Sequence, residues 1–510
     1  MDRENEHRLN QSLTNDLFQN IETFSEIFHA QTNQDFVKRE FCACGFPVCL
    51  IYLEGMTGGK LINDNVLRPL MACTPTHYIG ESERAHYLST AVVNISQTKI
   101  CENIRELCHS IIDGNSLLLI DGCHHGLLLE TRQYEKRSVE RTQNESVLVG
   151  AQNGFVENLR SNITQIRLIV RTPALVTQMH DVGNQIPTKV ALIYIDGVAH
   201  ENVLQEVRLR LNHLNVDAVP DCGTLQQLIE DSNLQMLPQM LQTERPDRTA
   251  DALLNGQVAI IVDNSPYALI APITFYHLFH SADDQYMRWQ YATFTRVMRI
   301  LGAFLSLYLP GLYIALTLHH THLIPLALLT SIAETRSKVP FPVLIEVLIM
   351  ELSFFMINEA GTRMPSQIGP ALGIVGALIL GQSAVAASII SPVLIIIVAL
   401  TGLGNYAVPV YSVALAFEML RLGMVISGAT LGFFGIVLTT FLYLCAFCTA
   451  RSFGILMASP ITPYRKHNPD IFVHLPMSMQ KRLLFTAKRD SWLKRTASDK
   501  PMRGWKEAKR

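Results

Sequence analysis

The sequence lacks several features that mark common classes of protein. Its first residues, MDRENEHRLNQSLTNDLF, contain no apolar core, so we expect no secretory signal and a front half that stays in the cytoplasm. The formal net charge is only −2, from 42 basic and 44 acidic side chains, which argues against a nucleic-acid partner. No GxxxxGK(S/T), GxSxG or HExxH motif is present. We therefore predict neither an enzyme nor a bound cofactor.

Metal-binding patterns are also missing. The ten cysteines are scattered, and their closest groups have no partners at the spacing of structural zinc ligands. These groups are Cys42, Cys44 and Cys49, and Cys445 with Cys448. We predict ordinary reduced thiols. His124 and His125 follow Cys123 in an expected turn, but no third ligand has a usable spacing, so we predict no metal site.

Apolar residues are distributed unevenly along the 510 residues. Uncharged runs crowd into 297–450, whereas residues 461–510 carry thirteen Lys and Arg against four Asp and Glu. A soluble α/β N-terminal region followed by an all-α transmembrane bundle is the predicted fold class. The predicted division is a polar tail 1–15, α/β subdomains 16–132 and 158–285 around a charged connector 133–157, a transmembrane domain 286–455 and a basic cytoplasmic tail 456–510.

The front half repeats itself at an offset of 142 residues. LFQNI, beginning at Leu17, falls on LRSNI, beginning at Leu159, and CLIYLEG falls on ALIYIDG at the same offset. GNSLLLIDG likewise falls on GQVAIIVDN. One shared offset without gaps predicts two related α/β subdomains whose Val/Ile/Leu runs are strands buried on both faces.

Acids follow the predicted strands at equivalent places in both subdomains. Two interpretations stay open: these acids lie where open α/β sheets bind ligands, or they simply begin turns before glycine. The acids are Glu54, Asp121, Asp196 and Asp263.

The charged sequence TERPDR, at 243–248, also has two interpretations. Its side chains form either a latch between the subdomains or a solvated loop ended by proline. The candidate latch residues are Glu244, Arg245, Asp247 and Arg248.

Several apolar runs are long enough to cross a bilayer, which needs about 20 apolar residues. Val297–Leu318, interrupted near its start by Arg299, supplies one crossing. The uncharged run Met364–Phe417 supplies two with a turn near Ser391 and Pro392, and Leu422–Ala450 supplies a fourth. An even number of crossings would leave both ends of the chain on the cytoplasmic side.

The segment 339–358 is apolar but carries Glu346 and Glu351, with Glu359 just beyond it. Carboxylates in hydrocarbon cost about 2.5–3.5 kcal/mol each on insertion scales, so they must face protein, water or the membrane interface. The segment is therefore either an acidic helix beside a cation route, or an amphipathic helix at the interface or a re-entrant helix, with its acids in headgroup water.

The helix predicted after Pro365 is rich in small residues at three- and four-residue spacing, which permits close helix approach. Gln382 adds one amide at mid-depth, as an interhelical hydrogen-bonding group or a pore-lining group. The candidate pore or packing residues are Gly369, Gly373, Gly376, Gly381 and Gln382.

Long ordered blocks of the sequence resemble one family. FPVLIEVLIMELSFFMINEAGTRMPSQIGPALG, TERPDR, ENLRSNITQIRLIVRTP and RSFGILMASPITP are similar to the A-subunit family of GerA-type bacterial spore germination receptors. The resemblance covers about residues 30–465 and includes Pro340, Pro342, Arg363 and Pro365. Stage V sporulation F-type proteins are a related branch that fits almost as well.

The resemblance implies a protein of the inner spore membrane with its N-terminal domain and C-terminal tail in the spore core. It also implies a homo-oligomer, a transporter-like B subunit that senses nutrients, and a lipoprotein C subunit. Our leading hypothesis is a subunit that forms or gates a cation channel and so triggers germination. The alternatives are a sporulation-branch channel that amplifies ion release, or a non-conducting scaffold for the other two subunits.

Overall fold

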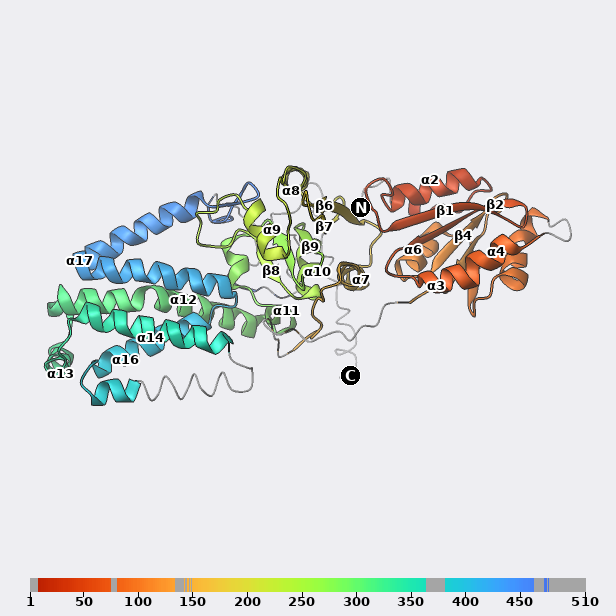
Figure 1. Ribbon diagram of the computed structural model, residues 1–510. Helices are drawn as coiled ribbons and strands as arrows, with labels where there is room; N and C mark the ends of the chain where they lie inside the picture. Colours follow the sequence, from red (N-terminus) through yellow and green to blue (C-terminus); the bar gives the residue numbers. More distant parts are fainter. Residues whose placement is uncertain are drawn as a thin grey trace, which may run out of the picture.

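Figure 1 shows two α/β subdomains followed by a bundle of long helices. The computed structural model describes residues 8–74, 80–133, 142, 145, 147, 149–363, 381–462, 472–474 and 476. The first subdomain lies at one end of the molecule and the helices lie at the other, with the second subdomain between them.

The first subdomain is an antiparallel five-stranded sheet, in the order β1-β2-β4-β5-β3, covered on both faces. Helices α2 and α6 cover one face, and the segment from α3 to η3 covers the other. The elements are α2 (Leu17–Ile27), β1 (Phe36–Ala43), β2 (Phe46–Leu53), α3 (Gly59–Ile62), η1 (Asn63–Leu67), α4 (Arg68–Ala72), η2 (Glu81–Glu83), α5 (Arg84–Tyr87), η3 (Leu88–Val92), β3 (Thr98–Cys101), α6 (Ile104–Ile112), β4 (Ser116–Ile120) and β5 (Gly126–Leu129).

The second subdomain repeats this plan, with the strand order β6-β7-β9-β10-β8. Helices α7 and α10 cover one face of its sheet, and α8 and α9 cover the other. The elements are α7 (Leu159–Ile169), β6 (Leu175–Val182), β7 (Thr188–Ile195), α8 (Glu201–Asn212), α9 (Cys222–Ile229), β8 (Leu241–Thr243), α10 (Pro246–Leu254), β9 (Val258–Val262) and β10 (Ala268–Ala271), followed by η4 (Phe275–Phe279) and α11 (Asp283–Tyr286).

The predicted duplication is confirmed down to single hydrogen bonds. Asn20 on α2 donates to the Thr14 carbonyl at 2.7 Å, and Asn162 on α7 donates to the Val156 carbonyl at 2.6 Å. Both asparagine side chains also accept from the backbone N–H of the same partner. A buried amide therefore fixes the segment before the first helix of each subdomain in the same way.

Of the two interpretations of the strand-end acids, the one that places them together at a ligand-binding edge does not fit the pairing of the strands. Because β2 and β4 are antiparallel, with Val48 opposite Ile120, Glu54 and Asp121 lie at opposite ends of the sheet. Asp196 and Asp263 are separated in the same way by the pairing of β7 with β9.

One buried ion pair joins the two subdomains. Arg167 on α7 donates to Asp35 at 2.8 and 3.0 Å, and both side chains are buried. Asn33 supports this pair by accepting from the same guanidinium at 3.2 Å. The charges are hydrogen-bonded to one another, which is the condition under which burial of charge is tolerated.

Long helices of the C-terminal half pack side by side (Figure 1). Their contacts give the directions: α12 runs away from the second subdomain, α14 and α16 run back toward it, and α17 starts beside the near end of α12. The elements are α12 (Trp289–Leu318), η5 (Thr321–Leu323), α13 (Leu326–Arg336), α14 (Val343–Arg363), α16 (Pro392–Tyr406) and α17 (Tyr411–Thr449).

Two of the uncharged runs that predicted crossings differ in their limits from the helices of the structure. The uncharged run to Phe417 ends as a helix at Tyr406, because Pro409 follows a short turn. The run Leu422–Ala450 is not one helix, because α17 breaks at Gly432, where φ is +62°. Tyr443 donates to the Leu420 carbonyl at 3.1 Å, so the two halves of α17 lie against each other as a hairpin.

Histidines at the end of α12 support this break. His319 contacts the Ala429 carbonyl at 2.9 Å, and His320 accepts from the Phe433 N–H at 3.4 Å. Both histidines provide hydrogen bonds to backbone groups that the interrupted helix leaves without helical partners.

The chain returns to the second subdomain after α17. Strands β11 (Arg451–Ser452) and β12 (Ile455–Leu456) form a short hairpin there. The Ser452 hydroxyl donates to the Gln239 carbonyl at 2.6 Å and accepts from the Ile273 N–H at 3.0 Å. The chain at the end of α17 is therefore fastened to this subdomain.

The prediction of reduced thiols is wrong for one pair. A disulfide joins Cys44, in the β1–β2 turn, to Cys73, which follows α4, with 5.1 Å between their Cα atoms. Sequence spacing gave no sign of it, because the packing of α4 against β1 brings together residues 29 positions apart.

Replacing Gly432 by alanine should destabilise the α17 hairpin. A Cβ there would lie 2.9 Å from the Cβ of His319, in a backbone conformation that side chains disfavour. We expect a loss of about 1–3 kcal/mol, measured as a lower midpoint of heat-induced aggregation of the detergent-solubilised chain. Gly381→Ala is the matched control, since its Cβ would meet Ile395 at an ordinary 3.8 Å. Equal midpoints for the two variants would contradict this assignment.

Candidate functional site in the helical bundle

In the described parts of α14 and α17, four charged side chains are buried. Glu346 and Glu351 on α14, and Glu418 and Arg421 on α17, are each less than one-tenth exposed. Charge removed from water costs several kcal/mol per ion unless it is paired and hydrogen-bonded. Each of these charges therefore needs polar partners on neighbouring helices, and the contacts with those partners are described below.

The central partners are Glu351 and Arg421, which form an ion pair of 2.8 Å between α14 and α17. Arg421 also donates to the Ser306 hydroxyl of α12 at 3.1 Å. A single guanidinium thus joins three helices, and its position depends on the register of all three.

A second polar layer lies nearer the soluble subdomains. Glu418 accepts from Asn405 of α16 at 2.7 Å and from Asn358 of α14 at 3.3 Å. The Tyr406 hydroxyl donates to the Asn358 side chain. Glu359 is half-buried, one residue beyond this layer.

The third layer lies at the far end of the bundle. Glu346 accepts from the Ser391 N–H at 3.2 Å, and Arg336, which ends α13, lies 4.0 Å away. Ser391 is the N-cap residue of α16, so the carboxylate also lies at the positive end of that helix. The predicted alternative in which Glu346 and Glu351 face headgroup water is wrong, because protein surrounds both.

The three layers follow one another along α14. Asn358, Glu351 and Glu346 are separated by seven and five residues, or about 10 Å and about 7.5 Å along the axis. We call Glu346, Glu351, Asn358, Glu418 and Arg421 the polar ladder. It extends about 18 Å through the apolar bundle.

Glycines allow the helices around the ladder to approach closely. Gly302 of α12 packs on the backbone of Gly404, and Gly311 packs on Met424 and Gly428 of α17. An added Cβ at any of these glycines would come within about 3 Å of a neighbouring atom. The sequence analysis predicted close helix packing at a different place, in the helix after Pro365.

Most residues predicted for that helix lie outside the described residues. These are Gly369, Gly373, Gly376 and Pro365. Gly381 is buried against Ile395, whereas Gln382 is exposed. Arg363 ends α14, Pro342 accepts from the Glu346 N–H just before its first turn, and Pro340 is exposed in the loop before it.

A buried joint connects the second subdomain to α12. Asp284 of α11 is fully buried and accepts from Arg296 at 2.8 Å and from Arg299 at 2.9 Å. Arg299 lies seven residues before Ser306 on the same helix. A rigid helix thus runs from the joint to the central layer of the ladder.

TERPDR forms a latch, but not between the two subdomains. Arg245 is fully buried and donates to Asp247 at 2.7 Å and to the Ala151 carbonyl at 2.8 Å. Arg248 pairs with Glu145 at 2.6 Å, and Glu244 accepts from the Glu145 N–H at 2.7 Å. The latch therefore holds the connector against the second subdomain, which also excludes a solvated loop.

The latch also reaches the start of the bundle. The Tyr286 hydroxyl of α11 donates to Asp247, and burial together with this carboxylate raises the pKa of the tyrosine to about 12. Tyr286 therefore keeps its proton at neutral pH. The connector, α10 and α11 are tied together just before α12 begins.

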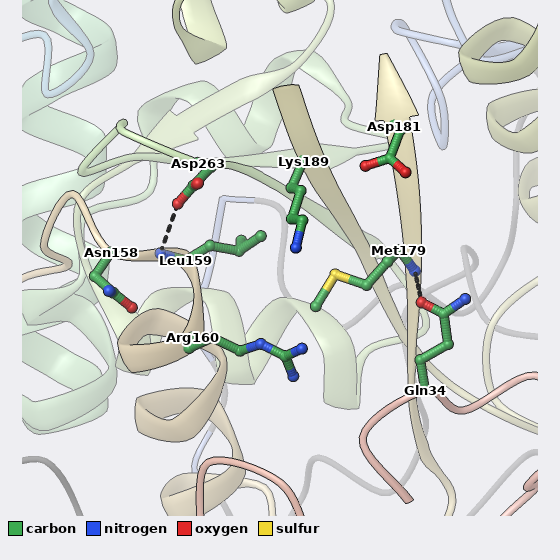
Figure 2. Close-up of a pocket in the computed structure, with 8 residues that line it drawn as sticks. All are labelled: Gln34, Asn158, Leu159, Arg160, Met179, Asp181, Lys189 and Asp263. Atoms are coloured by element: carbon green, nitrogen blue, oxygen red, sulfur yellow. Dashed lines mark hydrogen bonds between the residues drawn. The ribbon is translucent and has the colours of Figure 1, made fainter. Parts of the chain in front are cut away.

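Figure 2 shows a pocket where the subdomains meet. Gln34 comes from the first subdomain, and the remaining lining residues come from the second. The Leu159 N–H donates to Asp263 at 3.2 Å, while the Gln34 side chain accepts from the Met179 N–H at 3.0 Å. The pocket has a volume of about 380 Å³ and is lined by Gln34, Asn158, Leu159, Arg160, Met179, Asp181, Lys189 and Asp263.

Comparison with known proteins gives the family. The family of Bacillus/Clostridium GerA spore germination proteins matches residues 22–484. The chain belongs to the GerA family. It is a spore germinant receptor A subunit, a membrane protein with apolar helical spans and a member of a receptor complex.

Relatives of this GerA chain are similar over most of their length. Membrane protein YfkQ of Bacillus subtilis is 37% identical, over 85% of this chain and 83% of its own. Spore germination protein A1 of the same organism is 36% identical, over 87% and 91%. The crystal structure of the N-terminal domain of the Bacillus megaterium GerK3 A subunit is 29% identical, covering 52% of this chain and 98% of its own at a TM-score of 0.42.

Sequence reasoning missed three of the five ladder residues in this GerA protein, namely Asn358, Glu418 and Arg421. Glu418 and Arg421 separate two uncharged runs, and this break was taken as the boundary between crossings. The useful signal was their spacing of three residues, which places both on one face of a helix. An acid and a base together on an apolar helix indicate polar partners on its neighbours.

Replacing Glu351 by glutamine should strongly destabilise the bundle, because Arg421 would remain charged and buried. We expect a loss of about 3–5 kcal/mol, measured from heat-induced aggregation in detergent. The double variant Glu351→Met, Arg421→Met should recover part of it, since no unpaired charge remains. The exposed substitution Lys338→Met is the control. A single variant as stable as the control would show that the pair contributes little.

Replacing Arg245 by lysine should loosen the connector. Lysine cannot reproduce the paired bonds to Asp247 together with the carbonyl bonds of Glu145 and Ala151. We expect limited proteolysis to cut within 133–157 at least several-fold faster, with the bundle unaffected. Arg105→Lys, exposed in the first subdomain, is the control. Unchanged cleavage would mean that the latch does not hold the connector.

Proposed function

We propose that this A subunit, assembled as a homo-oligomer, forms or gates a cation channel in the inner membrane of the spore. The observation that carries the proposal is the polar ladder inside an otherwise apolar bundle. It extends about 18 Å, more than half of the roughly 30 Å hydrocarbon thickness of a bilayer. Buried carboxylates in a membrane protein commonly mark ion pathways.

The central ion pair is the proposed gate. While Glu351 is bound to Arg421, the carboxylate is neutralised and the guanidinium opposes the passage of cations. Separation of the pair would leave carboxylates at three depths, Glu346, Glu351 and Glu418. The segment after Pro365, with its small residues and Gln382, is the proposed neighbouring wall of the pore.

The proposed signal passes from the second subdomain through α12. The joint at Asp284 holds Arg299, and Ser306 lies about 10 Å further along the same helix. Since Ser306 accepts from Arg421, a shift of α12 would act on the gate directly. A B-type subunit that senses the nutrient and a C-type lipoprotein are the proposed partners, with the soluble domain and tail in the spore core.

A role without catalysis is also part of the proposal. Three strand-end acids have structural partners: Asp263 accepts from the Leu159 N–H, Glu54 pairs with Arg160 at 3.0 Å, and Asp196 lies 3.6 Å from His29. These contacts explain the presence of the three acids without requiring that they act on a substrate. Asp121→Asn and Asp263→Asn spores should therefore germinate normally.

Ser306→Ala tests the gate without changing any charge. Loss of its bond to Arg421 removes about 1 kcal/mol from the closed state, so basal cation efflux from proteoliposomes should rise about fivefold. Efflux of potassium and sodium is measured with the full-length chain. Ser353→Ala is the matched control, because that hydroxyl bonds only to the Ile349 carbonyl of its own helix.

The rival functions predict other results. A scaffold passes no ions in any variant, with or without its partners. A bulky replacement at Gly376 should alter conductance or assembly if its helix borders the pore, and unchanged ion release from such spores would exclude that helix. Co-purification of B-type and C-type subunits distinguishes a receptor from a sporulation-branch channel.

A further inference from the structure

Three metal-ligating side chains converge at one edge of the first subdomain. β3 and β5 are antiparallel, and their register places Cys101 opposite Gly126. One step beyond this pair, Glu102 of the β3 end lies opposite His125, with His124 beside it in the β4–β5 turn. The third ligand that sequence spacing failed to supply therefore comes from 22 residues upstream of His124.

The distances between the ligand atoms fit a single small ion. Glu102 Oε1 lies 2.9 Å from His125 Nδ1 and 3.7 Å from His124 Nε2, and all the ligand atoms lie within 4.8 Å of one another. Ligands at about 2.0–2.1 Å from a tetrahedral zinc ion are about 3.3 Å apart. Small side-chain rotations are enough to reach this spacing, because Glu102 and His124 are half exposed.

The backbone around the three residues is held in place. The Glu102 carbonyl accepts from the Leu13 N–H at 3.1 Å, and Asn103 caps α6 through the Arg105 N–H at 2.9 Å. On the other side of the cluster, Cys123 donates to the Glu81 carbonyl at 2.8 Å and fixes the turn that carries the histidines. Ordered backbone on both sides reduces the entropy lost when an ion binds.

The internal repeat places a second glutamate at the position equivalent to Glu102. Glu244 occupies the place of Glu102 in the second subdomain, and its carbonyl accepts from Phe155, the equivalent of Leu13. The Glu244 carboxylate accepts from the connector at Glu145, whereas the Glu102 carboxylate faces two histidines. The equivalent of the histidine pair in the second subdomain is Pro266 and Tyr267.

We propose that Glu102, His124 and His125 bind one divalent transition-metal ion of the zinc class. Two imidazoles and one carboxylate are the donors that such ions select over Mg²⁺ or Ca²⁺. Three protein ligands leave a coordination position open to solvent. The ion joins the β3 end to the β4–β5 turn, and its exposed position can accept a donor atom from another molecule.

Direct binding of Zn²⁺ and Co²⁺ tests the site. The full-length chain is purified in detergent without a polyhistidine tag and titrated by calorimetry, with Co²⁺ absorption in the visible range reporting the coordination geometry. We expect one ion per chain. Glu102→Gln, His124→Ala and His125→Ala should each weaken binding at least tenfold. His109→Ala, exposed on α6 of the same subdomain, should bind as the unaltered chain does.

Two results would overturn the proposal. One is the absence of stoichiometric binding of either ion, and the other is wild-type affinity in all three cluster variants. In either case the close contact between Glu102 and His125 is an ion-pair contact of the turn and not part of a metal site. Circular dichroism and gel filtration of each variant separate loss of ligands from loss of fold. The outcome is independent of ion conduction by the bundle.

Discussion

The buried guanidinium of Arg421 is the constraint on which the arrangement of the bundle depends. Its charge is stable among apolar helices only while Glu351 of α14 and Ser306 of α12 both remain within reach. The glycine contacts between Gly311 and Gly428 leave α12 and α17 little freedom to separate. A small shift along the helix axis would therefore disturb the polar contacts of Arg421 more than the surrounding apolar packing, because hydrogen bonds depend more strongly on geometry.

Attachment to the soluble region divides the bundle into two parts. Asp284 fastens the start of α12, and Ser452 fastens the chain just after α17. Helices α14 and α16 pack mainly against each other and against α12 and α17. The pair of Glu351 and Arg421 crosses this division. Movement of the second subdomain is thus expected to displace one partner of the ion pair relative to the other.

Features that are set by local sequence patterns were predicted from the sequence. Features that depend on contacts between distant segments of the chain were not. The offset of 142 residues identified both subdomains, because buried strands and the clamps of Asn20 and Asn162 are repeated in place. A hydropathy scale scores each residue without regard to its neighbours in space. The prediction therefore continued one span past Gly432 and placed the boundary of a span at Arg421. Glu346 and Glu351, about 140° apart on a helix, suggested a helix with no single polar face. Both are buried, because α16 contacts α14 on one side and α17 on another.

The duplication also accounts for the different surroundings of equivalent strand ends in the two subdomains. Glu102 and Glu244 end equivalent strands, and each backbone carbonyl holds the segment that precedes the first helix of its own subdomain. Because the backbone carbonyl holds this segment, the side-chain carboxylate of each residue can make different contacts in the two subdomains. In the second subdomain the carboxylate binds the connector beside Arg245 and so belongs to the path toward α12. In the first, which lies at the outer end of the molecule, the same position meets two histidines and can serve an external ligand (Figure 1).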